Sequence, residues 1–262
     1  MSSQNSSRVK APAHFVSLSN LFSNETNDPT APNFPERVVG DRNEQVTQPK
    51  IQKILKCKTN TIFSTFNVRS LTKDSRKQEL IQSFSKYNLD ILSIQEHRSY
   101  HPDCEFQHSC LEKNTLITSS AWKNSQGSTI GGIGLVLSPK ASSNLLSLNK
   151  ISDRIILAEF NSNPKTSFIS CYSPTNVSDE TIVDEFYSSL LSTLQQIPSH
   201  NFLIVAGDFN AQLGSGDVKF SFHKETNRNG HKLTDLILQC ELLASNTYFM
   251  KNSKKNVDLS IS

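Results

Sequence analysis

Four side chains that carry carboxylate or amide oxygens stand at the ends of short segments that predict strands, where a rigid scaffold could present them to a substrate. They are Asn67, Glu96, Asp208 and Asn210. Asp208 and Asn210 are two residues apart, so both would point to one face if the extended backbone continues past Ala206. Taken singly, each residue is more typical of a polar group that begins a loop. Taken together, they are the kind of oxygen set that a hard divalent cation prefers.

That cation would be Mg²⁺, with Mn²⁺ as a substitute. Mg²⁺ takes one or two carboxylates and leaves its remaining positions to water and substrate phosphate. Bound in this way, it can polarise a phosphoryl oxygen and stabilise the oxygen that leaves. The four residues therefore predict a metal site for phosphoryl chemistry.

The elements that must position these side chains are strands alternating with helices. Segments rich in β-formers or continuously apolar predict strands at 61–66, 90–95, 115–120, 133–137, 154–161, 166–171 and 202–206. Amphipathic spacing predicts helices at 71–87, 179–196 and about 230–240. The polar stretch 99–109 predicts a loop. This alternation indicates sheets covered by helices, hence an α/β or α+β domain.

The two ends of the chain differ from this central part. Residues 1–58 are rich in Ser, Asn, Pro, Thr and Gln without apolar periodicity. Such a stretch cannot bury enough apolar area to offset roughly 1–2 kcal/mol per residue of backbone ordering entropy. We therefore expect a disordered polar leader at 1–58, with a targeting or docking tail as the alternative, then a domain at 59–249. Residues 250–262 read as a short polar tail whose three lysines are solvated or, alternatively, contact nucleic acid.

Composition sets weak limits on function and compartment. The formal charge of +3 and the pI near 8.5 permit contact with a nucleic-acid backbone but do not demand it. Five scattered cysteines without a CxxC pair favour a reduced, intracellular setting, nuclear or cytoplasmic. The start of the chain has no signal-peptide pattern, and no window approaches the ~18 consecutive apolar residues of a membrane helix. We therefore expect no membrane partner.

Six short motifs occur in order along the chain. They are TFNVRSL at 65–71, SIQEHR at 93–98, GGIGL at 131–135, CYSPT at 171–175, VAGDFNA at 205–211, and a block from Asn227-Arg228-Asn229-Gly230 to Asn246-Thr247-Tyr248-Phe249. Together they resemble the endonuclease/exonuclease/phosphatase superfamily, in particular the apurinic-endonuclease-like domain of non-LTR (LINE-type) retrotransposons. The resemblance covers about residues 61–249.

The resemblance implies an α+β, four-layer α/β/β/α sandwich of the deoxyribonuclease-like type, with the site at one rim. It implies that Glu96 is the main metal carboxylate and that Asn67 helps to hold the metal or the scissile phosphate. Tyr172 would place a hydroxyl near the phosphate. Asp208 would orient or deprotonate the attacking water, and Asn210 would donate to the phosphoryl oxygen. The substrate would be the DNA phosphodiester backbone, cut to leave a 3′-hydroxyl, with a reverse transcriptase domain downstream in a full-length element.

The chain departs from the family pattern after residue 249. The family continues with a Trp-containing strand, an Asp-containing strand and a final Ser-Asp-His, and only residues 256–261 faintly echo the second of these. We therefore expect a domain that is incomplete at its C-terminus, with an uncovered sheet edge, and weak or absent activity. The histidines His97, His200, His223 and His231 read as surface residues and not as substitutes for the family's histidine.

Two rival functions and two weaker patterns stand beside this interpretation. The rivals are a non-catalytic derivative of the fold that binds nucleic acid or protein, and a phosphatase that acts on small phosphate esters. An H-x2-C-x3-H-x-C cluster matches no common structural zinc finger and is expected to be a polar loop; its members are His101, Cys104, His108 and Cys110. The Gly131–Gly134 run precedes a strand and lacks a GK[ST] sequence, so it predicts a hairpin turn and not a phosphate cradle.

Overall fold

The computed structural model describes residues 13–14, 60–218, 220–221 and 223–248. The predicted tail 250–262 and the echo at 256–261 lie outside these ranges, as does the predicted leader except for two residues. Those two, Ala13–His14, form the short strand β1. β1 pairs in parallel with β13 (Leu242–Leu243) late in the chain.

The first of two main sheets has five strands in the order β2-β3-β8-β5-β4. Its strands are β2 (Phe63–Asn67), β3 (Ile91–Gln95), β8 (Ile133–Leu137), β5 (Asn114–Ser119) and β4 (Phe106–Leu111). β2 and β3 run parallel, so their carboxyl ends reach the same edge, and Asn67 lies beside Gln95. This pairing brings the residues that follow both strands together.

The second main sheet has four strands in the order β12-β11-β10-β9. Its strands are β12 (Phe202–Asp208), β11 (Thr166–Tyr172), β10 (Ile155–Phe160) and β9 (Leu145–Ser152). β11 and β12 are also parallel, and their register ends with Tyr172 beside Asp208. The second sheet thus presents a phenol and a carboxylate at its own rim.

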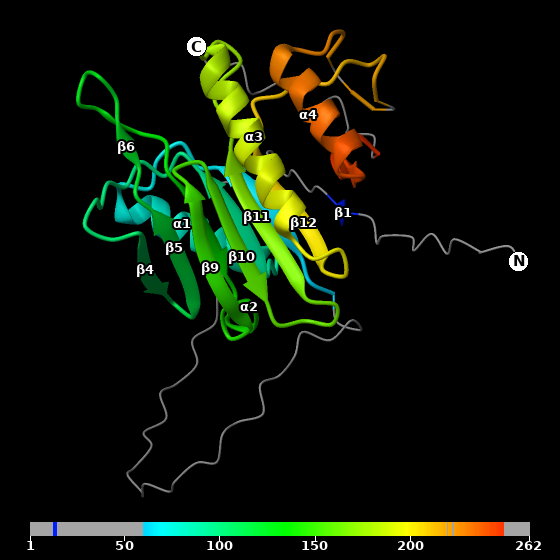
Figure 1. The fold of residues 1–262 in the computed structure, drawn as a ribbon. Coiled ribbons are helices and arrows are strands. Elements are labelled where there is room, and N and C mark those ends of the chain that lie inside the picture. Colours follow the sequence, from blue (N-terminus) through cyan, green and yellow to red (C-terminus); the bar gives the residue numbers. More distant parts are fainter. Residues whose placement is uncertain (1–12, 15–59, 219, 222, 249–262) are drawn as a thin grey trace, which may run out of the picture.

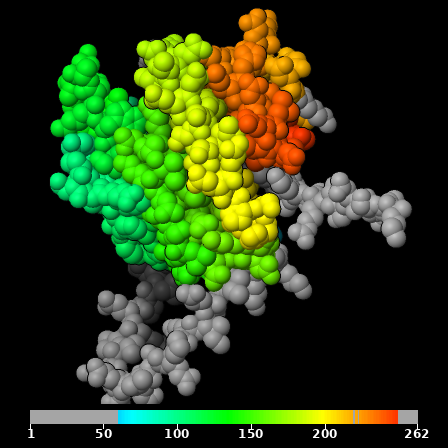
Figure 2. Space-filling model, viewed as in Figure 1, coloured from blue at the N-terminus to red at the C-terminus, as the bar shows by residue number. Residues whose placement is uncertain are grey.

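The two sheets pack face to face and helices cover their outer faces, which confirms the predicted α/β/β/α sandwich (Figure 1). The side chains between the sheets form one apolar cluster that includes Leu135, Phe160 and Phe168. Helix α1 (Asp74–Lys86) packs through Ile81 and Phe84 on the outside of the first sheet. Helices α3 (Glu180–Gln196) and α4 (Arg228–Gln239) cover the second sheet, and they lie side by side on the molecular surface (Figure 2).

Short elements complete the described chain. They are α2 (Pro139–Ser142), β6 (Trp122–Lys123), β7 (Thr129–Ile130) and the 3-10 helix η1 (Ser245–Thr247). β6 and β7 form a small hairpin that ends in the Gly131–Gly132 turn. No helix within the described ranges is both long enough and apolar enough to cross a membrane.

The predicted strands and helices are confirmed within a few residues, with two corrections. The polar stretch 99–109 is a loop only in its first part, because Phe106–Leu111 forms the edge strand β4, paired with β5. Strand β9 at Leu145–Ser152 was not predicted; it pairs with β10 and has alternating, partly exposed side chains. Both strands carry many polar residues, and neighbouring strands stabilise them more than their own β propensity does.

Candidate functional site

The predicted site residues meet at one rim of the sandwich, where strands of both sheets end. The amide nitrogen Nδ2 of Asn67 donates to Oε1 of Glu96 at 2.8 Å and to Oδ2 of Asp208 at 3.0 Å. Asn67 ends β2 and Glu96 follows β3 in the first sheet, whereas Asp208 ends β12 in the second. One amide group therefore joins two carboxylates from opposite sheets. Asn67 and Asp208 lie 141 positions apart in the sequence, so only the fold brings them together.

Glu96 is held by several donors in an uncommon backbone conformation. Its φ is 59°, in the left-handed region that non-glycine residues seldom adopt. Oε1 also accepts from the Tyr172 hydroxyl at 3.0 Å, and Oε2 accepts from Arg98 at 3.3 Å. Burial would raise the pKa of Glu96, but hydrogen bonds from Asn67, Tyr172 and Arg98 and the charge of Arg98 hold this pKa below its usual 4.5. Glu96 is therefore ionised at neutral pH and suits a cation.

Tyr172 is a hydrogen-bond donor at this rim. Its side chain is buried, and burial together with the nearby charges of Glu96 and Asp208 raises its pKa well above the usual 10, against the opposing charge of Arg154. The hydroxyl consequently keeps its proton and donates a hydrogen bond to Glu96. A protonated phenol beside the carboxylate can also face a substrate oxygen.

The strand geometry ends at Asp208 and not at Asn210. Asn210 has φ 46°, its backbone N–H donates to Oδ1 of Asp208 at 2.9 Å, and its Nδ2 donates to the Ser173 carbonyl at 2.8 Å. The two-residue alternation expected from the sequence therefore does not extend to Asn210. A tight turn closed by the Asp208 side chain replaces it. One amide hydrogen of Asn210 is left for another acceptor.

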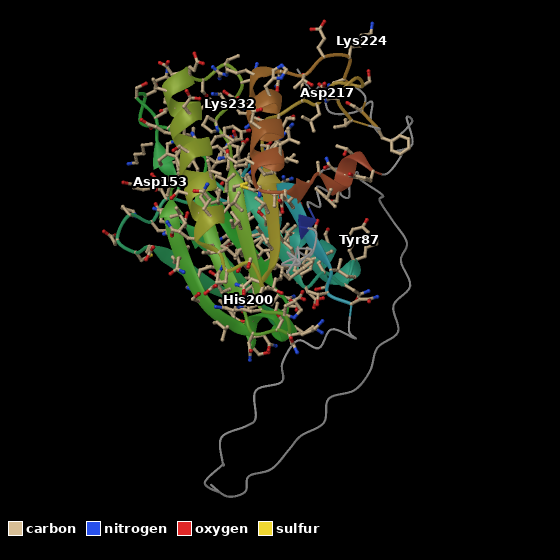
Figure 3. All side chains as sticks on the ribbon, turned by 45° about the vertical axis from the view of Figure 1, so that its right-hand side comes forward. Tyr87, Asp153, His200, Asp217, Lys224 and Lys232 are labelled. Atoms are coloured by element: carbon tan, nitrogen blue, oxygen red, sulfur yellow. The ribbon has the colours of Figure 1, made fainter. Side chains whose placement is uncertain are left out.

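A cavity of about 530 Å³ opens beside these groups, between the ends of β2 and β12 and the start of α4. Asn67, Asp208 and Asn210 line it, together with Gln95 and the exposed His223. His200 lies elsewhere: Figure 3 labels it at the opposite end of the sandwich from Asp217 and Lys224, which belong to the connection after β12. Glu96 and Tyr172 do not line the cavity, so it lies on the side of the site where Asn67 and Asp208 are.

His97 is not the surface residue that we expected from the sequence. Its side chain is fully buried, its Nδ1 accepts from the Ser99 N–H at 3.0 Å, and its Nε2 lies 3.2 Å from the Ile133 carbonyl. The proton is therefore on Nε2. The expectation failed because the residues on both sides of it, Glu96 and Arg98, have positive φ and turn the chain out of the strand pattern. His200, His223 and His231 are exposed as predicted.

The Asn227–Gly230 turn supports the site, although the sequence analysis used it only as part of a motif. Asn229 is fully buried, and its Nδ2 donates to the Pro174 carbonyl at 2.8 Å. The neighbouring Arg228 donates to the carbonyls of Asn176 and Ser178, each at 2.8 Å. The start of α4 thereby fixes the loop that follows Tyr172. An asparagine-rich turn just before a helix was the available sequence signal.

Within the described part of the chain, the His/Cys cluster takes no part in the hydrogen bonds of Glu96 and Asp208. His101 and Cys104 are neighbours in the loop before β4, with 3.4 Å between Nδ1 and Sγ, and His108 and Cys110 belong to β4 itself. The cysteines within the described ranges are all free thiols. Those same ranges hold no group of three or more His, Cys, Asp or Glu side chains arranged for a metal ion.

The donor set at the rim nevertheless fits a hard divalent ion of the Mg²⁺ kind. Such an ion needs only one or two carboxylates from the protein and takes water and phosphate for the rest. Glu96 and Asp208 supply two carboxylates at one amide, and the carbonyl oxygen of Asn67, which accepts from the Arg69 N–H at 3.1 Å, retains a second lone pair. Oxygen donors without thiol or imidazole select a hard cation.

Comparisons with known proteins agree with this architecture. No protein-family model matches the chain. It is 26% identical over 210 residues to Craniofacial development protein 2 of Bos taurus and of Tragulus javanicus. The match covers 76% of this chain and 33% and 34% of those proteins, so the chain spans about a third of the length of these curated relatives.

Two solved structures share the fold. One is the 3′ phosphatase NExo from Neisseria bound to product DNA hairpin, with TM-score 0.50 and 16% identity over 67% of this chain and 69% of that one. The other is the AP endonuclease LMAP from Leishmania major, with TM-score 0.51 and 13% identity over 68% and 66%. The chain thus has the mixed α/β sandwich fold of the AP endonucleases.

Proposed function

We propose that the chain is a divalent-metal-dependent phosphodiester hydrolase of the endonuclease type, with DNA as its substrate. One observation carries this proposal: a single Asn67 amide group donates to both Glu96 and Asp208, which come from different sheets. Two carboxylates drawn to one point repel each other, and a divalent cation offsets that repulsion. The fold shared with the AP endonuclease LMAP supports the same class of reaction.

Each side chain then has a role that its contacts allow. A bound Mg²⁺ or Mn²⁺ would polarise a phosphoryl oxygen and stabilise the leaving oxygen. Glu96 would hold the ion, with Asn67 fixing its carboxylate, and the Tyr172 hydroxyl would face the phosphate. Asp208 would orient the attacking water and accept its proton. The remaining amide hydrogen of Asn210 would donate to the phosphoryl oxygen as charge develops, and cleavage would leave a 3′-hydroxyl.

We propose further that turnover is slow. Within the described residues, no imidazole hydrogen-bonds to Glu96 or Asp208, and His97 is committed to the Ile133 carbonyl. A positioned acid–base group is worth ~10²–10⁴ in rate. The same observation favours the second candidate, a derivative of the fold that binds metal and nucleic acid without cleaving it.

A metal-binding and cleavage assay tests both candidates. Mn²⁺ binding by calorimetry should be lost in Glu96→Ala and kept in Glu79→Ala, a change to an exposed carboxylate on α1. Nicking of plasmid and abasic-site duplex, and release of phosphate from 3′-phosphorylated duplex, by the wild type should be slow and should disappear with Glu96→Ala. Binding without cleavage would select the non-catalytic derivative. Unchanged Mn²⁺ binding in Glu96→Ala would contradict both proposals.

The retrotransposon origin is part of the proposal and rests on sequence alone. The motif TFNVRSL and the block from Asn227 to Phe249 are its support. If the origin is correct, genomic sequence that continues the reading frame beyond codon 262 should encode a reverse transcriptase. A different domain in that position would refute the retrotransposon assignment and leave the metal site untouched.

A further inference from the structure

Three side chains from separate parts of the chain stack beside Glu96. Trp122 lies in β6, Arg154 in the turn between β9 and β10, and Tyr172 at the end of β11. The guanidinium carbon of Arg154 is 4.6 Å from the Trp122 ring centre and 5.4 Å from that of Tyr172. The two rings are 6.4 Å apart and tilted by 32°. One cation thus contacts both aromatic faces.

Arg154 is bound to the strand that carries Tyr172. Its Nη1 donates to the backbone carbonyl of Tyr172 at 3.3 Å, and the backbone N–H of Tyr172 donates to the Arg154 carbonyl at 2.9 Å. The ion pairs found within the described residues do not include Arg154. Its contacts are therefore directed at Tyr172 and Trp122 and not at a carboxylate.

Trp122 packs against the Gly131–Gly132 turn, which also binds the backbone of Glu96. A Cβ atom on Gly131 would collide with the indole, so the ring rests directly on that glycine. The carbonyl of Gly131 accepts from the Arg98 N–H at 3.0 Å, and the carbonyl of Gly132 accepts from the Glu96 N–H at 2.8 Å. The turn fixes Glu96 on one side and Trp122 on the other. The Tyr172 hydroxyl donates to Glu96 at 3.0 Å.

We propose that Trp122 and Arg154 are positioning residues that hold the Tyr172 hydroxyl on Glu96. Ile133 and Ile156 pack against Tyr172 in one small cluster, and Trp122 packs against the same cluster. Without the stack, the phenol of Tyr172 would lose the packing that Trp122 and Arg154 provide. Its hydroxyl would then donate a hydrogen bond to Glu96 only part of the time. The consequence for metal binding rests on the proposed function, whereas the contact between Tyr172 and Glu96 does not.

A metal-free measurement tests the contact itself. In protein labelled with ¹³C at tyrosine Cζ, the Tyr172 resonance, assigned with Tyr172→Phe, should shift as acid protonates the Glu96 carboxylate. Glu96→Gln should abolish that shift. Trp122→Leu and Arg154→Met should reduce it by at least half. Lys123→Gln is the matched control, because Lys123 lies on the same strand but contacts Tyr100, at 4.6 Å, and not the stack.

Mn²⁺ affinity, measured by calorimetry, tests the consequence. Trp122→Leu and Tyr172→Phe should each weaken binding roughly 10-fold, as is common when a partner of a metal ligand is lost. The double variant should be no weaker than Tyr172→Phe alone, because Trp122 acts through Tyr172. Additive losses would mean that Trp122 acts by another route and would overturn the proposal.

The two arms separate the possible failures. If the wild type binds no Mn²⁺ but Trp122→Leu loses the tyrosine shift, the proposed metal function fails and the positioning role stands. If Trp122→Leu lowers the melting temperature but keeps the full shift, its role is structural and the proposal is wrong. Trp122→Phe, which keeps an aromatic face for Arg154, should retain most of the shift and of the affinity.

Discussion

The buried imidazole of His97 and the two glycines beside it show how single residues shape this rim. Gly131 and Gly132 have φ values of 70° and 89°, and a Cβ on Gly132 would lie 2.6 Å from the His97 ring. His97 therefore fills space that the absent side chain of Gly132 leaves. Burial lowers the pKa of His97 from 6.5 to about 4, against the opposing hydrogen bond to Ile133.

This pKa shift predicts a loss of stability in mild acid. Folding keeps His97 neutral, so its contribution is complete above the unfolded pKa of 6.5 and declines as the pH falls toward 4. At pH 5 the loss should be about 2 kcal/mol. Glu96, whose pKa is lowered, adds its own loss only below about 4.5. Urea unfolding at several pH values between 7.5 and 5 measures the slope, which should flatten in His97→Gln.

The exposed His200 provides the control for that slope. His200→Gln should leave the pH dependence as in the wild type, because the His200 side chain is exposed and not buried like that of His97. If His97→Gln and the wild type lose the same free energy of unfolding between pH 7 and pH 5, the buried neutral imidazole is not the cause.

Substitutions at the glycine turn separate backbone strain from collision. Gly127 and Gly132 both have positive φ, but a Cβ on Gly127 would meet nothing within 4 Å. Gly127→Ala should therefore cost about 1 kcal/mol, from the left-handed backbone alone. Gly132→Ala must in addition displace His97 and should cost at least 2 kcal/mol more. Equal melting temperatures for the two variants would show that the His97 contact is not tight.

At the scale of elements, the start of α4 acts as a clamp on the loops that carry the site. Asn227 caps the helix by accepting from the Gly230 N–H at 2.8 Å, and Asn229 donates to the Pro174 carbonyl. Asn227 thus acts mainly as an acceptor, with one long 3.4 Å hydrogen bond from its Nδ2 to the Asn210 carbonyl, whereas Asn229 acts as a donor. Side-chain caps of the first kind satisfy a backbone N–H that would otherwise lack a partner.

An aspartate at each position distinguishes these roles. Asn227→Asp keeps the accepting oxygen and should change the free energy of unfolding by less than about 0.5 kcal/mol. Asn229→Asp loses the donor and turns a carboxylate toward the Pro174 carbonyl, so it should cost at least 2 kcal/mol. It should also weaken Mn²⁺ binding. Chemical unfolding and calorimetry give both values, and a tolerated Asn229→Asp would contradict the clamp.

The elements that bear the carboxylates could be predicted because their signals are local. The continuous apolar run before Asp208 and the short run before Glu96 mark buried strands within a few residues of sequence. The stack could not be predicted, since Trp122, Arg154 and Tyr172 meet only when both sheets pack. For the same reason β9, which depends on pairing with β10, gave no clear local pattern.

At the scale of the whole molecule, the site exists only where the two sheets meet, and polar groups help to fix how they meet. The hydroxyls of Ser93 and Ser170 lie 2.6 Å apart across the sheet interface. Ser93 also accepts from Nε2 of Gln95 at 2.7 Å, the residue just before Glu96. A buried polar chain therefore leads from the centre of the sandwich to its rim.

Alanine at each serine should have unequal effects. Ser93→Ala leaves the buried amide of Gln95 without its acceptor, which typically costs about 1–3 kcal/mol. Ser170→Ala leaves Ser93 with Gln95 and the Ala206 carbonyl as partners, so its cost should be near 1 kcal/mol. Urea unfolding compares them. A larger loss for Ser170→Ala would contradict this order of contacts.

The position of Trp122 has an optical consequence. It is the only tryptophan in the chain, and it stacks on the guanidinium of Arg154. Arg154 also contacts Tyr172, whose hydroxyl donates to Glu96. Light absorbed selectively by indole therefore excites one place in the molecule, and the emitted intensity and colour report on that place alone. The intrinsic fluorescence of the unmodified protein can therefore report the binding of a metal ion or a substrate at the rim.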